Sequence, residues 1–227
     1  MPTRHRILVV EDELSLRTGI VDLLAFKGHA PEGVGTGTDG LKRALEADFS
    51  LIILDLMLPG LNGLDVCRRV REAKPAQPIL LLTAKGREED ILAGFEVGCD
   101  DYVTKPFSLS ILTARVDALL RRSDTPDPTL QWPGLSIDVA NYRAVGEQTV
   151  DLNPRDVSLM QYLSANADRV VTREELLREV WGYRSTARVE TRAIDMHMVK
   201  LRRKLAVAAP GVSLVETVRG VGYRLAP

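Results

Sequence analysis

The sequence predicts two domains: an α/β domain built on a parallel sheet, and a smaller α+β domain that ends in a β-hairpin. Three observations support this. Short apolar runs alternate with helical patterns over residues 1–122, an order typical of strands joined by crossover helices. Residues 123–129 are polar and interrupted by prolines, as expected of a linker. Over residues 130–227, short alternating segments and three helical patterns replace that order.

Five strands are expected in the first domain. In chain order they lie at residues 7–10, 30–34, 51–54, 79–82 and 101–103. The first, third and fourth are continuous apolar runs, which indicates strands buried on both faces. Helical patterns separate them, with apolar residues on one side at 14–26, 41–45 and 66–70, and a helix at 109–122 closes the domain. These features predict a five-stranded, doubly wound parallel sheet.

The second domain begins with short segments of alternating hydrophobicity at residues 135–139, 142–145 and 149–152. Such segments predict a small antiparallel sheet. Helical patterns follow at 154–167, 172–181 and about 190–206, and two strands at 212–218 and 222–225 form the terminal hairpin. Three helices followed by a hairpin are typical of an α+β winged helix-turn-helix domain.

The composition is that of an ordinary protein with two cores, since 45% of the 227 residues are hydrophobic and 27% are charged. There is no 18-residue apolar run and no segment typical of a signal peptide. Cys67 and Cys99 have neither a disulfide pattern nor metal-ligand spacing, so we expect two buried thiols. We therefore expect a soluble, cytoplasmic protein with no membrane partner.

The charge is unevenly distributed, although the net charge is only −1. Residues 1–122 hold 16 basic and 18 acidic side chains, and residues 123–227 hold 14 and 13. From Arg188 to Arg224 there are eight basic and three acidic residues, whereas residues 138–179 hold five and eight. A basic face on a nearly neutral domain is typical of a DNA-binding protein.

Polar side chains collect where the strands of the first domain end. Glu11 and Asp12 follow the first strand, Asp55 the third and Thr83 the fourth, and Lys105 comes shortly after the fifth. The carboxyl ends of parallel strands meet at one edge, so these side chains should lie close together. Crowded carboxylates imply a bound cation, and oxygen ligands favour Mg²⁺. Beside a lysine and a hydroxyl, this set suits phosphoryl transfer to Asp55.

Two alternatives compete with this interpretation. Each acid, taken alone, is more simply an ordinary solvated loop residue. A phosphatase of the haloacid dehalogenase type would also form a phosphoaspartate, but such enzymes place two aspartates two residues apart after their first strand. Here the candidate aspartate follows the third strand, and the residue two positions later is Met57. The switch interpretation therefore has the better match.

Residues 5–122 resemble the receiver domains of two-component systems, which are flavodoxin-like. The matching motifs lie at residues 7–13, 54–60, 82–84 and 98–107. The resemblance implies that a phosphohistidine on a sensor histidine kinase donates its phosphoryl group to Asp55. It also implies a Mg²⁺ site made by Asp12, Asp55 and the Met57 carbonyl, with Glu11 acting mainly through water.

The same resemblance assigns roles to four further residues. Lys105 would pair with the phosphate, and the bond to Pro106 would be cis. Thr83 would turn to hydrogen-bond the phosphate and Tyr102 would follow it inward. This switch would reset the face formed by the fourth helix, fifth strand and fifth helix.

The helix expected near residues 190–206 has two different sides. One carries an apolar stripe that should face the core: Ile194, Met198, Leu201 and Leu205. The other side carries the candidate DNA contacts, with Arg202 and Lys204 flanking Arg192, Met196, Val199, Lys200 and Arg203. Such a helix fits the major groove, and Arg219 at the hairpin turn is placed for the minor groove. A solvated basic helix, RNA binding and a protein-only adaptor are the alternatives.

Residues 130–227 resemble the winged-helix effector domain of OmpR/PhoB-type regulators, which control transcription and are not enzymes. The matching motifs lie at residues 152–156, 173–182, 190–205 and 216–224. Two residues depart from the usual pattern: Val157 stands where an aromatic is usual, and Val199 where polar residues are common. Val199 is able to touch a thymine methyl group instead. By the same resemblance, residues 181–189 form the loop that faces RNA polymerase.

The resemblance further implies a homodimer that forms on phosphorylation and places two effector domains on tandem half-sites of double-stranded DNA. Asp100, Asp101, Arg115 and Arg122 match the charged residues that pair across such dimers. Ile91 and Ile111 stand where a basic and an acidic residue normally pair, and Leu92 and Phe95 adjoin Ile91. We expect an apolar contact across the dimer there; the alternative is that both isoleucines pack within each protomer.

Overall fold

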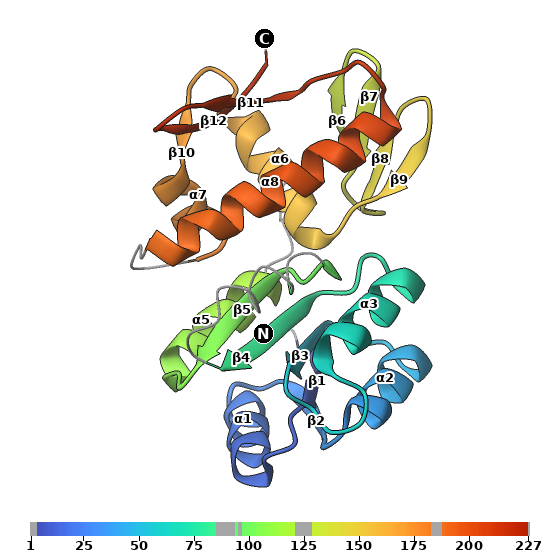
Figure 1. Cartoon of the computed structure of the whole chain (residues 1–227), viewed down its shortest axis with the longest axis vertical. Helices are drawn as coiled ribbons and strands as arrows, with labels where there is room; N and C mark the ends of the chain where they lie inside the picture. The colour runs from blue at the N-terminus through green and yellow to red at the C-terminus, as the bar shows by residue number, and fades with distance from the viewer. Residues whose placement is uncertain (1–3, 85–93, 95–96, 121–128, 183–187, 227) are drawn as a thin grey trace. The chain divides into compact units, whose positions relative to one another are not determined.

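The computed structural model describes residues 4–84, 94, 97–120, 129–182 and 188–226 (Figure 1). The chain divides into two compact units, Met1–Arg121 and Arg122–Pro227. Most of the expected linker, residues 123–128, lies outside the described residues, whereas Thr129 already belongs to a strand. Four expected dimer residues also lie outside them: Ile91, Leu92, Phe95 and Arg122. The same holds for residues 183–187 of the expected polymerase-facing loop.

The first unit is a five-stranded parallel sheet with helices on both sides, as predicted. Its elements are β1 (Arg6–Val10), α1 (Leu14–Phe26), β2 (Ala30–Val34), α2 (Gly37–Glu46), β3 (Leu51–Asp55), α3 (Gly63–Ala73), β4 (Ile79–Ala84), β5 (Asp101–Lys105) and α5 (Leu109–Leu120). The strand order is β2-β1-β3-β4-β5. Figure 1 shows α1 and α5 on one side of the sheet and α2 and α3 on the other.

The strands of this unit are buried because their sequences are apolar throughout. All five residues of β3 are buried, and residues 7–10 of β1 are fully buried. Local signals begin two of the helices: the Thr36 and Asn62 side chains accept hydrogen bonds from the third residue along, Asp39 and Asp65. Sequence and burial together fix which ends of the strands form the polar edge.

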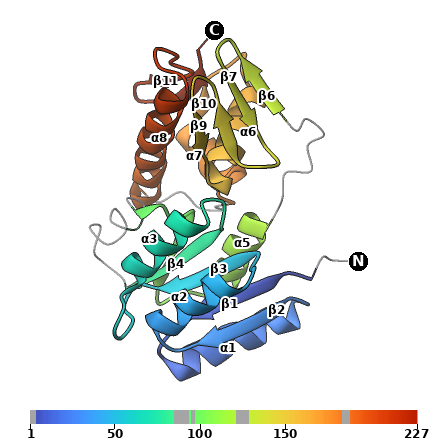
Figure 2. The same cartoon turned by 90° about the vertical axis from the view of Figure 1, so that its right-hand side faces the viewer.

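The second unit contains a four-stranded sheet, three helices and a hairpin. Its elements are β6 (Thr129–Trp132), β7 (Leu135–Asp138), β8 (Arg143–Val145), β9 (Thr149–Asp151), α6 (Pro154–Ala165), β10 (Val171–Thr172), α7 (Arg173–Glu179), α8 (Arg188–Ala208), β11 (Val215–Val218) and β12 (Gly222–Leu225). The sheets have the orders β6-β7-β8-β9 and β10-β12-β11. This is the predicted winged-helix architecture, and Figure 2 shows the first sheet beside α6.

The structure differs from the expected elements in three places. β6 and β10 were not predicted, because four and two residues are too short to show a clear alternation. The strand expected at 142–145 begins one residue later, since Tyr142 has a φ of 53°, which is not a strand conformation. The strand expected at 212–218 begins at Val215.

Two expectations from composition have structural counterparts. Cys67 and Cys99 are both free and buried, as predicted. Among the helices of the described residues, none combines the length and the hydrophobicity needed to cross a lipid bilayer.

Candidate functional site

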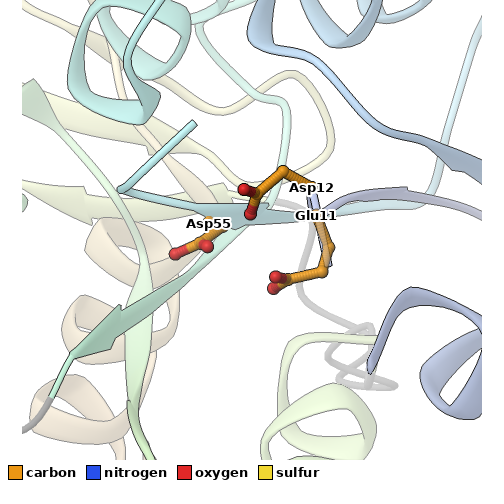
Figure 3. A group of neighbouring side chains, drawn as sticks. All are labelled: Glu11, Asp12 and Asp55. Carbon is orange, nitrogen blue, oxygen red and sulfur yellow. The ribbon is translucent and has the colours of Figure 1, made fainter. Parts of the chain in front are cut away.

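The polar edge of the parallel sheet brings the expected acidic residues together. Glu11 and Asp12 follow β1, and Asp55 ends the neighbouring strand β3. One carboxylate oxygen from each lies within 4.8 Å of the others. Figure 3 shows the three side chains converging on one space. Glu11 and Asp55 are buried, while Asp12 is exposed, so the cluster is reachable from solvent.

Lys105, at the end of β5, contacts two of these acids. Its Nζ donates to Glu11 Oε2 and to Asp55 Oδ2, each at 2.8 Å. Burial raises the pKa of the Glu11 carboxyl; the nearby Asp55 charge acts in the same direction, and the hydrogen bond from Lys105 only partly offsets both. Burial by itself would lower the pKa of Lys105, but its hydrogen bonds to Asp55 and Glu11 outweigh that effect and raise it. One cation thus faces three carboxylates.

Backbone groups and one arginine hold these acids in place. The Met57 amide donates to Asp55 Oδ1 at 3.3 Å. A Cβ atom on Gly63 would lie 2.1 Å from the Asp55 carbonyl oxygen, so only glycine lets α3 begin this close to β3. Arg17 donates through Nη1 to the carbonyls of Glu11 at 2.6 Å and Asp12 at 3.2 Å. Sequence reasoning missed Arg17, which is one turn into α1.

The other expected receiver residues lie on neighbouring strands. Thr83 is buried on β4, one residue beyond the position paired with Asp55. Tyr102 is buried on β5, paired with Leu81. The Lys105–Pro106 bond is cis, as expected.

The expected dimer residues that the structure describes differ in their surroundings. Asp100 is fully buried: its Oδ2 accepts from Arg71 at 2.9 Å and from the Ile79 amide at 2.8 Å. Asp101 is also buried, and its Oδ2 lies 3.8 Å from Nε of Arg115 on α5. Ile111 remains 48% exposed.

The long helix α8 of the second unit has the two sides that its sequence predicts. Ile194, Met198, Leu201 and Leu205 are buried, which confirms the core stripe. On the other side Val199 and Arg203 are exposed, while Met196 and Lys200 are half-buried. The side chain of Arg192 lies outside the described residues.

Two of the basic residues expected to flank the DNA-contacting side have partners within the unit. Arg202 donates to the Val215 carbonyl at 2.9 Å and to Thr217 Oγ1 at 2.8 Å, which ties α8 to β11. Lys204 Nζ lies 2.6 Å from Asp156 Oδ2. In contrast, no described residue forms an ion pair with Arg203. Arg202 and Lys204 therefore position the helix, and Arg203 is available for a ligand.

A buried charged cluster fastens α8 to α6, and sequence reasoning missed it. His197 is 3% exposed, and its Nε2 lies 2.9 Å from Asp156 Oδ1. Asp156 also accepts from the Asn153 amide at 2.9 Å as part of a capping box. Although burial alone would raise the pKa of Asp156, His197 and Lys204 outweigh it and hold the pKa well below its usual range. A signal was present, because His197 falls three residues after Ile194 and one before Met198, within the core stripe.

The hairpin of β11 and β12 turns at Arg219, Gly220 and Val221. Gly220 has a φ of +74°, which suits glycine at a tight turn. Arg219 and Val221 are both exposed, so a cation and an apolar group stand side by side at the tip.

Two family descriptions match this chain: "Response regulator receiver domain" over residues 7–117 and "Transcriptional regulatory protein, C terminal" over residues 146–225. The DNA-binding response regulator MtrA of Mycobacterium tuberculosis is 42% identical over 227 residues, covering 99% of this chain and 98% of MtrA. The chain belongs to the OmpR/PhoB-type response regulators.

Solved structures agree with this assignment. A mutant of the response regulator RitR matches with a TM-score of 0.73 and 32% identity, covering 97% of this chain and 98% of that one. DrrB, an OmpR/PhoB homologue of Thermotoga maritima, matches with a TM-score of 0.53 and 30% identity, covering 99% and 100%. This response regulator is thus a DNA-binding transcription regulator of a two-component system.

Proposed function

We propose that a sensor histidine kinase switches this regulator by phosphorylating Asp55. The observation that carries the proposal is the buried Asp55 carboxylate, hydrogen-bonded to Lys105 and crowded by Glu11 and Asp12. An Asp55 oxygen attacks the phosphorus of the kinase phosphohistidine, a P–O bond forms and the P–N bond breaks. The electron pair of that bond stays on the histidine nitrogen, which is neutral or takes up a proton from solvent.

The residues around Asp55 fit a Mg²⁺ ion, since all three side-chain donors are carboxylate oxygens and one lysine leaves them under-neutralised. Asp12, Asp55 and the Met57 carbonyl would hold the ion directly, with Glu11 acting through water. When bound, the ion would supply charge stabilisation for the transferred phosphoryl group. Lys105 neutralises one phosphoryl oxygen, and Thr83 donates its hydroxyl to another, with Tyr102 following inward.

The output of the switch is a dimer bound to tandem half-sites of double-stranded DNA. Phosphorylation favours a receiver face that pairs with a second copy, which raises the effective concentration of two effector domains. Asp100 is already held within the unit by Arg71, so we assign the ion pairing across the dimer to Asp101, Arg115 and Arg122. Ile111, with Ile91, Leu92 and Phe95, forms the apolar part.

The remaining functional assignments follow from this role. DNA binding places the protein in the cytoplasm with the chromosome, and residues 181–189 contact RNA polymerase. The regulator is not a turnover enzyme, because the single phosphoryl group on Asp55 is the signal rather than an intermediate.

Labelling with small phosphodonors tests the switch. With acetyl phosphate or phosphoramidate and Mg²⁺, intact-mass spectrometry should show one added phosphoryl group, and Asp55→Asn should show none. Sedimentation velocity on the same samples should show more dimer only in the labelled wild type. Equal labelling of Asp55→Asn would contradict the assignment, and many turnovers of donor per protein would favour a phosphatase.

DNA titrations test the reading surface. Arg203→Ala and Arg219→Ala should each weaken binding by about 1–3 kcal/mol, because each removes an exposed cation. If the arginine contacts a base, the preferred sequence changes; if it contacts only phosphate, all sequences are weakened and the salt dependence becomes shallower. Wild-type affinity in both variants would rule out this surface.

A further inference from the structure

The side of α8 that carries Arg203 also exposes a large apolar side chain. Val199 is 44% exposed, although the helix already buries Ile194, Met198 and Leu201 in the core. It follows Met196 by three residues and precedes Arg203 by four, so the three share one side of the helix. Val199 therefore does not serve the packing of its own unit to the extent that the buried stripe does.

The chemistry of the major groove gives such a side chain one good partner. Base edges there present hydrogen-bond donors and acceptors, with a single apolar exception, the 5-methyl group of thymine. The isopropyl group of Val199 has nothing to donate or accept. Placed against a G·C pair it would remove water from polar base edges without replacing the lost hydrogen bonds, which is unfavourable. Against a thymine methyl it would bury apolar surface on both molecules.

We propose that Val199 reads one A·T base pair in each half-site through the thymine 5-methyl group. The inference rests on the proposed function, in which this side of α8 enters the major groove, and it adds the base preference at one position. Arg203, one turn further along the helix, provides the charge that brings Val199 to the groove. Val199 is thus a specificity-determining residue, while Arg202 and Lys204 position the helix on β11 and α6.

The test removes only the methyl group. Sequences bound by the phosphorylated full-length chain are first selected from random duplex DNA. Each thymine of the selected half-site is then replaced, one at a time, by deoxyuridine, which keeps the base pair and loses the methyl. For wild type, one replacement should weaken binding about 4-fold, the factor that burial of one methyl group corresponds to. For Val199→Ala the same replacement should have no effect.

Val207→Ala is the matched control, because Val207 is a valine on the same helix with 50% exposure. This variant should keep the full deoxyuridine effect. Val199→Ala is expected to fold normally, since the residue is exposed and alanine favours helix; its circular dichroism spectrum and thermal midpoint check this.

The outcomes separate two failures. If a sequence is selected but every deoxyuridine affects wild type and Val199→Ala equally, the role of Val199 is wrong and DNA binding through α8 is unaffected. The same conclusion holds if the selected site has G·C at all positions that Val199→Ala changes. If no sequence is selected by the wild type, the proposed function itself fails, and this inference fails with it.

Discussion

Two charged clusters, one in each unit, contain similar residues in opposite balance. In the receiver unit, Glu11, Asp12 and Asp55 share one lysine. In the effector unit, the single carboxylate of Asp156 accepts from Lys204, His197 and the Asn153 amide. Burial pushes both sets of carboxyl groups toward the neutral form, yet the pKa of Glu11 is raised while that of Asp156 is lowered. The number of positive partners per carboxylate decides the sign.

This difference separates a binding site from a structural clamp. A carboxylate with more partners than it needs is already stabilised, so removing it harms the fold. Carboxylates with too few partners repel each other, so the unliganded fold loses little or gains when one is removed, and a cation completes the set. The three predictions below test this contrast, beginning with the largest effect.

The largest effect is expected for Asp156→Asn. The change leaves the buried His197 and the Lys204 ammonium without their shared carboxylate, and breaking a buried pair of this kind costs about 3–5 kcal/mol. Chemical denaturation of the full chain, followed by the fluorescence of Trp181, which packs against His197, measures the loss in the effector unit. Asp168→Asn is the control, because Asp168 is exposed and should change stability by less than about 0.5 kcal/mol. Equal stability of wild type and Asp156→Asn would show that the cluster is not a clamp.

The pH dependence of that difference is the second test. Because the pKa of Asp156 is lower in the folded state than its unfolded value of about 3.9, its stabilisation is fully present above that value. The stabilisation decreases as the pH falls below about 4. The gap in unfolding free energy between wild type and Asp156→Asn should therefore be constant near neutral pH and shrink in acid. A gap that widens in acid would contradict this assignment of charge.

The smallest effect is expected at the acidic pocket. Mg²⁺ at tenfold its dissociation constant should stabilise the receiver unit by about 1.4 kcal/mol. Without Mg²⁺, Asp12→Ala should be as stable as wild type or slightly more so, because it relieves repulsion; with Mg²⁺ it should gain much less. Asp22→Ala, an exposed position on α1, should respond like wild type. Thermal midpoints with and without Mg²⁺ measure both, and an equal Mg²⁺ response in Asp12→Ala would contradict the ligand assignment.

Local patterns in the sequence were sufficient to predict the polar edge of the receiver. Continuous apolar runs identify buried parallel strands, and chain order then puts Glu11, Asp55 and Lys105 at one edge, without any knowledge of side-chain geometry. The same reasoning identified the buried stripe of α8, because helical periodicity alone separates its two sides. Each of these features depends on residues within one element or on the direction of the strands.

The tertiary structure alone decided which charged residues remain available for a ligand. Arg202, Arg203 and Lys204 are consecutive basic residues on one helix, and sequence treats them alike. In the folded unit Arg202 bonds to β11 and Lys204 to Asp156, 48 residues earlier, which leaves Arg203 exposed. Asp100 is likewise taken by Arg71 rather than left at the surface. Periodicity gives the side of a helix on which a residue lies, whereas the partner it meets depends on which distant element packs there.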